Sequence, residues 1–278
     1  YVFGRGSEEA EALASAGLAF EVVPGVTAAI AVPAYAGMPV THRREAVRAT
    51  MVTAHEAIKS DGPQVRWDLL AADPHASLLG YMGVTSLPGV VEKLLAGGLD
   101  PATPAAMISR GTTSAQHVVR ATVAGLPRAV VEAELEPPAL FIIGPTVRHA
   151  DRLDWFGGRP LQGERLTMVA PAGALGEVLE LAGAEIVEIP LPATPASRVV
   201  MGALPLTGCV FCDPEAVEAL DEERLGLGWG HEVVAWCVTP EAAGRARRAG
   251  WRNIEELNAP VTGEQLVSAL RAKGRREK

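Results

Sequence analysis

The sequence predicts an α/β protein of two units, and three observations carry that prediction. Short apolar runs rich in β-forming residues alternate with stretches of helical periodicity, a pattern typical of alternating strands and helices. The chain has 278 residues, more than one compact domain usually needs. Turn-forming residues cluster at 154–163, where the periodicity stops. We therefore place a boundary near Gly158, with a first domain at 1–158 and a second at 164–278.

The first unit opens with a helix and a short β-rich run. Ser7 is placed to cap a helix that carries two glutamates in its first turn and ends at Gly17. Residues 20–23 predict a strand that stops at a Pro-Gly turn, and residues 27–36 predict a small apolar helix that begins there. The later elements alternate, with strands expected at 49–54, 77–82, 105–109, 117–123 and 140–143 and helices at 65–72, 87–96 and 127–134.

The second unit repeats this alternation. A proline-rich stretch from Pro190 to Pro195 interrupts it, and a charged tail closes the chain. The pattern favours a sheet covered by helices. Strands are expected at 166–170, 185–189, 209–212 and 232–238, and helices at 174–181, 214–220, 241–249 and 263–271.

Composition and charge narrow the class of protein. The 33 acidic and 25 basic residues give a net charge of −8, which excludes binding of nucleic acid through a broad positive field. Hydrophobic residues make up 48% of the chain, enough to exclude disorder as the dominant state. No apolar run reaches the length of a membrane span, and the chain does not open with a basic region followed by an apolar one. We therefore expect a cytoplasmic protein.

The three cysteines lie in the last quarter of the chain, and Cys209 and Cys212 have C-x-x-C spacing. That spacing is compatible with a redox or zinc pair, but the run is apolar and no second Cys/His pair stands at ligand spacing. We favour a buried strand end for this segment, and we expect no metal site in the protein.

A series of ordered motifs in the first unit closely resembles one family, the uroporphyrinogen-III C-methyltransferases among the tetrapyrrole methylases. The order of the motifs over about 155 residues is far more specific than any one of them. The motifs are Val2-Phe-Gly-Arg-Gly6, Phe20-Glu-Val-Val-Pro-Gly-Val-Thr-Ala-Ala29, Ala34-Tyr-Ala-Gly-Met-Pro-Val-Thr-His-Arg43, Val52-Thr-Ala-His-Glu56, Gly80-Tyr-Met-Gly83, Arg110-Gly-Thr-Thr-Ser-Ala-Gln-His-Val-Val119, Pro138-Ala-Leu-Phe-Ile-Ile-Gly144 and Leu153-Asp-Trp-Phe156.

The resemblance implies a fold and an activity. Members have two α/β lobes with S-adenosylmethionine in the cleft between them, and they methylate uroporphyrinogen III at C2 and C7 to give precorrin-2, on the way to sirohaem or cobalamin. Members also carry a glycine-rich loop and a Gly-Gly-Asp-Pro segment ahead of the position of Tyr1, and neither is present here. We therefore expect the C-terminal portion of a two-lobed methylase, without most of the first lobe and with turnover in doubt.

The resemblance implies cofactor contacts at Val2, Thr27, Ala28, Met82 and Gly111. Thr27 and Ala28 open a predicted helix, where backbone N–H groups are available to a ligand. Met82 offers a flexible apolar wall for an adenine or a methylthio group, and Gly111 allows close approach of the backbone. Taken singly, each residue has an ordinary structural explanation, so the order of the motifs carries the inference.

The implied substrate carries many carboxylates, so an acidic protein must present a local cationic surface to it. Arginine suits this task because its planar guanidinium binds carboxylates bidentately. Arg5, His42 and Arg43 lie in or beside the matched motifs, and we expect them to bind substrate. Arg44 is equally well explained as a solvated surface charge.

Methylation of a ring carbon also requires a base to remove a ring proton. His42, His55 and His117 are candidates by chemistry alone, and the sequence does not single out one of them. Two alternatives to the leading interpretation stay open. One is another precorrin methyltransferase, and the other is a non-catalytic protein that binds tetrapyrrole or assembles with pathway partners. The resemblance further implies a homodimer.

Blocks in the second unit, from Val169-Ala-Pro171 to the segment 261–270, resemble uroporphyrinogen-III synthase more loosely. That family has two such lobes around a cleft, whereas residues 164–278 suffice for one. Cys212-Asp213 stands where the family shows hydroxyl residues. Thr239 and Thr262 are possible anion contacts, although helix caps explain them better. We expect this unit to be inactive or to serve as a docking partner.

Overall fold

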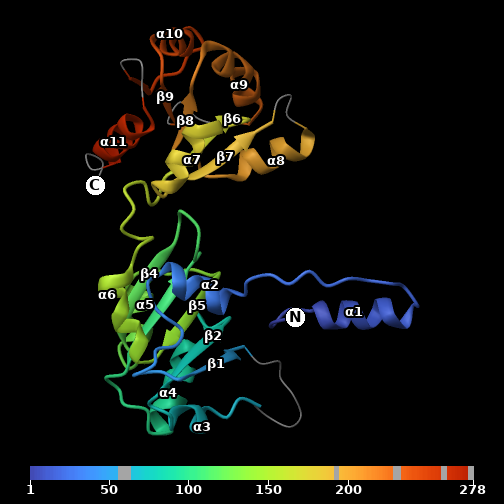
Figure 1. Ribbon diagram of the computed structural model, residues 1–278, viewed down its shortest axis with the longest axis vertical. Helices are drawn as coiled ribbons and strands as arrows, with labels where there is room; N and C mark the ends of the chain where they lie inside the picture. The colour runs from blue at the N-terminus through green and yellow to red at the C-terminus, as the bar shows by residue number, and fades with distance from the viewer. Residues whose placement is uncertain (56–63, 191–193, 228–232, 258–261, 275–278) are drawn as a thin grey trace. The chain divides into compact units, whose positions relative to one another are not determined.

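The computed structural model describes residues 1–55, 64–190, 194–227, 233–257 and 262–274. Contacts between Cα atoms divide the chain into two compact units, Tyr1–Gly157 and Gly158–Lys278. Each unit contains one five-stranded sheet with helices packed on it (Figure 1). The expected α/β class is therefore confirmed. Among the described residues, no helix is both long enough and apolar enough to span a membrane.

The sheet of the first unit is mixed, with the strand order β1-β2-β5-β3-β4. β1 and β2 are parallel, β5 is antiparallel to both β2 and β3, and β4 is antiparallel to β3. β1, β2 and β3 therefore run in one direction and end at the same edge. The strands are β1 (Arg48–Thr53), β2 (Ala76–Tyr81), β3 (Pro104–Ser109), β4 (His117–Thr122) and β5 (Ala139–Ile143).

Helices cover both faces of this sheet. α3 (Trp67–Ala71), α4 (Leu87–Ala96) and α5 (Leu126–Glu132) share one apolar core with the side chains on one face of the strands. α2 (Ala28–Tyr35) and the 3-10 helix η1 (Pro145–His149), followed by α6 (Ala150–Leu153), form the second core. Adjacent residues along a strand alternate between the two cores, because successive side chains of a strand point to opposite faces.

Two expectations for the start of the chain are wrong. Helix α1 (Gly6–Ser15) has Arg5 rather than Ser7 at its N-cap, and the Ser7 hydroxyl donates to Glu8 inside the helix. Residues 20–23 form no strand, and Val23 is 83% exposed. A β-rich run needs a neighbouring strand for its backbone hydrogen bonds, and none of the described strands pairs with this segment.

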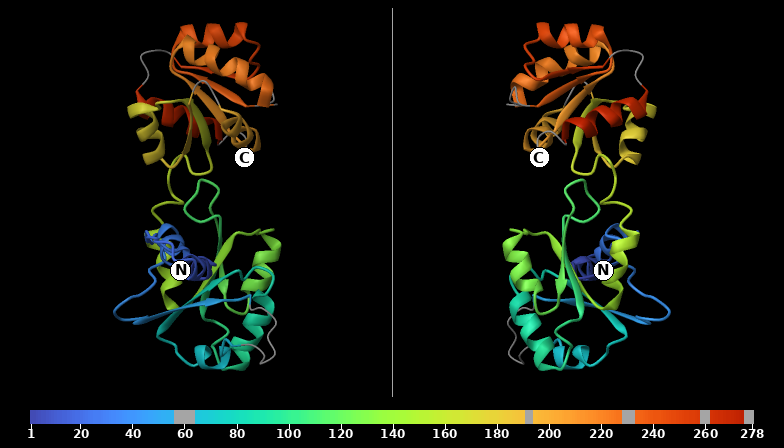
Figure 2. Two further views of the ribbon diagram at one scale, coloured as in Figure 1. Left: turned by 90° about the vertical axis from the view of Figure 1, so that its right-hand side faces the viewer. Right: turned by 90° about the vertical axis from the view of Figure 1, so that its left-hand side faces the viewer.

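The sheet of the second unit is entirely parallel, with the strand order β10-β9-β8-β6-β7. Helices lie on both of its faces (Figure 2). The strands are β6 (Arg165–Val169), β7 (Glu185–Ile189), β8 (Gly208–Phe211), β9 (Val234–Cys237) and β10 (Ile254–Glu256). The helices are α7 (Gly173–Leu181), α8 (Pro195–Ala203), α9 (Pro214–Leu227), α10 (Pro240–Arg248) and α11 (Gly263–Gly274).

A helix that the pattern did not predict begins at the last proline of the proline-rich stretch. Pro195 is the first residue of α8, a position where its missing N–H costs nothing. Thr239 and Thr262 do act as helix caps. The Thr239 hydroxyl accepts from the Ala242 N–H, and the Thr262 hydroxyl accepts from the Gln265 N–H.

Gly80 in β2 provides a test of the first core. A Cβ at this position would lie 1.9 Å from Cζ of Phe141, whose side chain is fully buried. We expect Gly80→Ala to lower the free energy of unfolding by about 1–3 kcal/mol, because the ring must be displaced. Urea denaturation measures this change.

Gly89 is the matched control. It lies in α4, and an added Cβ there meets open space. Gly89→Ala should raise the free energy of unfolding by about 0.5–1 kcal/mol, because glycine weakens a helix interior. Equal effects of the two substitutions would contradict the packing of Phe141 on β2.

Candidate functional site

The residues that follow β1, β2 and β3 lie at one edge of the first sheet, named here the carboxyl edge. It comprises residues 53–55, 81–83 and 109–112, joined by His117, which pairs with Ser109 at the start of β4. Ligands of open α/β sheets bind outside the carboxyl ends of parallel strands. The topology therefore selects this edge as the first place to look for a site.

The backbone at the carboxyl edge is strained. Five non-glycine residues in the described parts of the chain have positive φ. Met82 (φ 55°), Arg110 (φ 48°) and Thr112 (φ 72°) belong to the edge, and Phe3 (φ 49°) packs against it. Such conformations cost about 1–3 kcal/mol each and cluster at functional sites. The strain marks this edge as a candidate site independently of any motif.

Tyr81 joins the end of β2 to the start of α2. Its hydroxyl lies 2.5 Å from Thr27 Oγ1 and accepts a hydrogen bond of 2.9 Å from the Ala29 N–H. The ring of Phe3 packs on the Tyr81 ring at a centroid distance of 5.0 Å. The segment around Phe3, the start of α2 and the end of β2, which are distant in sequence, therefore meet at the carboxyl edge.

Gly111 lies against α2, about one turn beyond the start of that helix. A Cβ on Gly111 would lie 2.6 Å from the two Cγ atoms of Val32, so only glycine fits. The Gln116 side chain holds this loop in place by accepting from the Thr112 N–H at 2.8 Å and donating to the Tyr35 carbonyl at 3.3 Å. The loop after β3 is thereby fixed on the helix.

The five positions predicted to contact the cofactor are thus brought to one region. Val2 adjoins the Phe3 ring on Tyr81, Thr27 and Ala28 begin α2, and Gly111 packs on the same helix. Met82 follows β2 with its side chain 50% exposed, an apolar group left in contact with solvent. Their role in binding a cofactor stays a prediction.

The residues predicted to bind substrate are not brought together. Arg5 is the exposed N-cap of α1. His42 and Arg43 lie in the turn before β1, where the Val47 N–H donates to the His75 carbonyl just ahead of β2. Because the six residues of β2 span about 17 Å, this turn lies at the edge of the sheet opposite the carboxyl edge. The substrate role of these residues stays a prediction.

Two of the three candidate bases lie at the carboxyl edge. His55 follows β1, where its N–H donates to Thr53 Oγ1 at 3.3 Å and the Thr53 hydroxyl donates to the His55 carbonyl at 3.0 Å. His117 begins β4 opposite Ser109, and both imidazoles are exposed. His42 lies at the opposite edge. The structure therefore favours His55 and His117 over His42.

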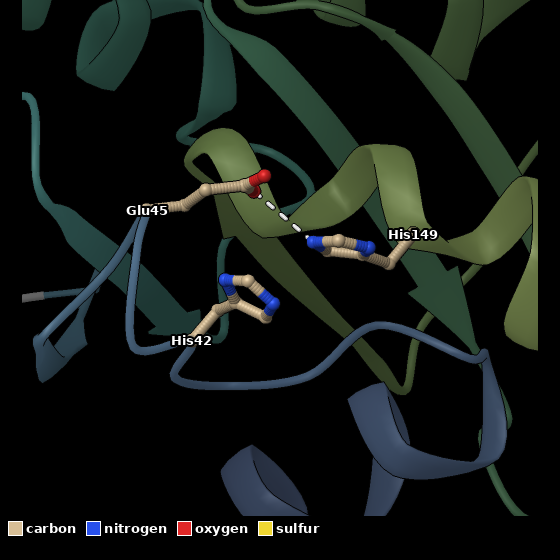
Figure 3. A group of neighbouring side chains, drawn as sticks. All are labelled: His42, Glu45 and His149. Carbon is tan, nitrogen blue, oxygen red and sulfur yellow. Dashed lines mark hydrogen bonds and ion pairs between the residues drawn. The ribbon is translucent and has the colours of Figure 1, made fainter.

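Sequence reasoning missed the surroundings of His42. Glu45 Oε2 lies 3.0 Å from His149 Nε2, and the rings of His42 and His149 lie 4.7 Å apart between centroids (Figure 3). The spacing of His42 and Glu45 within one turn was visible in the sequence. His149 is 104 residues beyond Glu45, so no local pattern could have pointed to it.

The second unit has a pocket of about 360 Å³ at the point where the strand order reverses, between β6 and β8. Residues 168–171 line one side, and Asp213 and Glu215 contribute two carboxylates on the other. None of its described lining residues is cationic. A pocket with this charge does not suit a ligand rich in carboxylates.

The cysteines of the second unit only partly follow expectation. Cys209 is buried in β8, but Cys212 follows that strand and is exposed, so the prediction that the whole run is buried is wrong at Cys212. The strand ends one residue before Cys212. Desolvation by partial burial raises the pKa of the Cys212 thiol, and the charge of Asp213 raises it further. This shift disfavours the reactive thiolate.

Residues 1–127 match the model of the family described as Tetrapyrrole (Corrin/Porphyrin) Methylases. The siroheme synthase of Tolumonas auensis is 44% identical over 164 residues, which cover 59% of this chain and 34% of that protein. The siroheme synthase of Pseudomonas aeruginosa strain UCBPP-PA14 is 44% identical over 158 residues, which cover 57% of this chain and 33% of that protein. The chain spans about a third of the length of these relatives.

Two solved structures are similar in sequence to part of the chain. The native form of uroporphyrin III C-methyl transferase from Thermus thermophilus is 34% identical, covers 53% of this chain and 60% of that one, and has a TM-score of 0.44. The same enzyme complexed with S-adenyl homocysteine is 35% identical, and the match covers 53% of this chain and 62% of that one, with a TM-score of 0.42. In that complex the homologue binds S-adenyl homocysteine.

Tyr81→Phe tests the junction at the carboxyl edge. The substitution removes the hydroxyl that accepts from Ala29, whose N–H would then be buried without this partner. We expect a loss of about 1–3 kcal/mol in the free energy of unfolding, measured by urea denaturation. Tyr35→Phe is the control. The Tyr35 ring is held by packing on Trp155 and Phe156, so its loss should be below about 0.5 kcal/mol. Similar losses in both variants would argue against the junction.

Cys212 provides a test based on pH. Because its pKa is raised, less thiolate is present at pH 8 than for an ordinary cysteine, and alkylation by iodoacetamide should be slower. The rate should still rise above pH 9. Asp213→Asn should speed alkylation at pH 8 while keeping the helix cap on Ala216, since asparagine also caps helices. Mass spectrometry of the Cys212 peptide measures the rate. A plateau below pH 9 would show that the pKa is not raised.

Proposed function

We propose that the first unit takes part in S-adenosylmethionine-dependent C-methylation of uroporphyrinogen III at C2 and C7, which gives precorrin-2. One observation carries the proposal: the strained residues Met82, Arg110 and Thr112 lie within the motifs that resemble the methylases, and they share one edge of the sheet. Strain of this kind persists only where the surrounding structure enforces it. The tetrapyrrole methylase match over residues 1–127 supports the same activity.

The cofactor would bind at the carboxyl edge. The first turn of α2, at Thr27 and Ala28, offers backbone N–H groups, and Met82 offers an exposed apolar wall. Val2, next to Phe3 on the Tyr81 ring, and Gly111, which packs on α2, would border the ligand. When bound, S-adenosylmethionine supplies an electrophilic methyl group on a sulfonium.

The residues of this chain would contribute alignment, exclusion of water and removal of a proton. A nucleophilic pyrrole carbon forms the new C–C bond as the C–S bond breaks and S-adenosylhomocysteine leaves. The cationic ring that results then loses a proton from another position to a base, because the methylated carbon, which already carries a side chain, has no hydrogen left. His55 and His117 are the candidates that border the carboxyl edge. Arg5, His42 and Arg43 remain our candidates for contacts with substrate carboxylates.

For the second unit we propose no synthase turnover. The pocket at its switch point presents Asp213 and Glu215 where a carboxylate-rich substrate would need cations. Thr239 and Thr262, the possible anion contacts, already bond to backbone N–H groups of their own helices. Incubating the chain with hydroxymethylbilane and separating the uroporphyrinogen isomers tests this, and rapid formation of isomer III would contradict it.

Titration of the chain with S-adenosylhomocysteine, followed by calorimetry, tests the proposed cofactor site. We expect a micromolar dissociation constant, which corresponds to about −8 kcal/mol. Met82→Asn should weaken binding about tenfold, because it replaces the apolar wall with an amide while asparagine tolerates the positive φ. The matched control is Leu69→Asn, which changes an exposed apolar residue of α3 and should leave the affinity unchanged.

Arg5→Ala separates the cofactor role from the substrate role. It should weaken binding of uroporphyrinogen III more than binding of S-adenosylhomocysteine, since Arg5 is assigned to substrate carboxylates. Equal loss of both would remove that assignment. Failure of the unmodified chain to bind S-adenosylhomocysteine would overturn the cofactor site and favour a non-catalytic binding protein.

A further inference from the structure

Three potential metal ligands converge at the edge of the first sheet opposite the carboxyl edge. His42, Glu45 and His149 each offer one donor atom, and these atoms all lie within 4.8 Å of one another (Figure 3). The closest pair is Glu45 Oε2 and His149 Nε2, at 3.0 Å. Two imidazole nitrogens and one carboxylate oxygen therefore border a common space.

The backbone holds these side chains in place. His42 and Ala46 form an antiparallel bridge, with the His42 N–H donating to the Ala46 carbonyl at 2.8 Å and the reverse bond at 2.9 Å. The Glu45 N–H donates to the His42 carbonyl within the same turn. His149 ends η1, which is anchored in the core through buried Val147. Little ordering of the backbone would be needed to bind a ligand.

An ion pair between His149 and Glu45 does not by itself account for the arrangement. Their side chains are 26% and 28% exposed, and such a pair contributes only about 0–1 kcal/mol. The His42 ring lies 4.7 Å from the His149 ring and is tilted by 30°. Imidazole nitrogens and a carboxylate are both common metal ligands, and both types are present here.

The charged side chains next to Glu45 do not prevent a cation from binding between the three ligands. The nearest guanidinium is that of Arg148, whose Nη2 is 3.9 Å from Glu45 Oε2 and whose side chain is 64% exposed. It can turn into solvent without breaking the turn or the helix. The imidazole of His75 faces the Glu45 backbone carbonyl, 3.3 Å away, rather than the carboxylate.

We propose that His42, Glu45 and His149 bind a divalent first-row transition metal ion, with one or more coordination positions left open. Two imidazoles and one carboxylate suit zinc, iron(II) or cobalt(II) better than calcium or magnesium. Bond lengths of about 2.0–2.2 Å require donor atoms about 3–3.5 Å apart. The Glu45–His149 pair already meets this, and rotation of the His42 side chain closes the remaining separation.

The site is separate from the proposed cofactor site, and it shares only His42 with the residues proposed to contact substrate. It lies about the length of β2, roughly 17 Å, from the carboxyl edge, and none of the five cofactor positions belongs to it. The open positions would be filled by water or by a ligand from solution. Loss of the metal site would therefore leave the titration with S-adenosylhomocysteine unaffected, so the two proposals can fail separately.

Cobalt(II) and zinc titrations of the metal-free chain test the proposal. We expect one equivalent of cobalt(II) to produce visible d–d absorption bands and one equivalent of zinc to bind by calorimetry. His42→Gln, Glu45→Gln and His149→Gln should each weaken binding by at least about tenfold. The matched controls are His117→Gln and Glu132→Gln, which remove the same residue types from β4 and α5 and should bind as the unmodified chain does.

A second measurement needs no folded variant. Zinc should protect His42 and His149 from diethyl pyrocarbonate in the unmodified chain, while exposed His117 stays reactive; mass spectrometry locates the modified residues. Absence of cobalt bands and of zinc binding would overturn the proposal. Metal binding that survives all three cluster substitutions, or zinc protection that omits His42 and His149, would overturn it as well.

Discussion

The antiparallel insertion of β5 between β2 and β3 is the constraint on which the first unit depends. Because β5 pairs with both neighbours, β2 and β3 run in the same direction and their last residues meet at one edge. The Arg110 N–H donates to the Pro138 carbonyl just before β5, which fixes the loop that follows β3. The other end of β5 leads through Gly144 into η1 and so positions His149. One strand thus organises both the carboxyl edge and the opposite cluster.

The sequence predicted the secondary structure correctly where the local apolar pattern agrees with the tertiary structure. Alternating apolar runs predicted nine of the ten strands in the described parts of the chain, and β10 was missed because three residues carry too little periodicity. The run at 20–23 shows the limit of β propensity, since no described strand pairs with it. Helix α8 was missed because the prolines that lead up to it, Pro190, Pro192 and Pro195, resemble those of a loop. Pro195 in fact occupies the one helical turn that accepts proline.

The candidate sites were predictable to different degrees. The resemblance to a family pointed to Met82 and Gly111, and the topology brings both to the carboxyl edge. The strain at Met82, Arg110 and Thr112 was not foreseeable, because methionine, arginine and threonine have no preference for positive φ. The cluster around Glu45 was equally hidden, because His149 follows β5 and lies 104 residues beyond Glu45 in the sequence.

The positive φ values at the carboxyl edge have a consequence for laboratory evolution. Glycine or asparagine at Met82, Arg110 or Thr112 would relieve backbone strain, so a library selected only for heat resistance should accumulate such replacements. Each replacement would also remove the present side chain from the edge. These are therefore the positions at which selection for robustness and selection for ligand recognition would drive the gene in opposite directions.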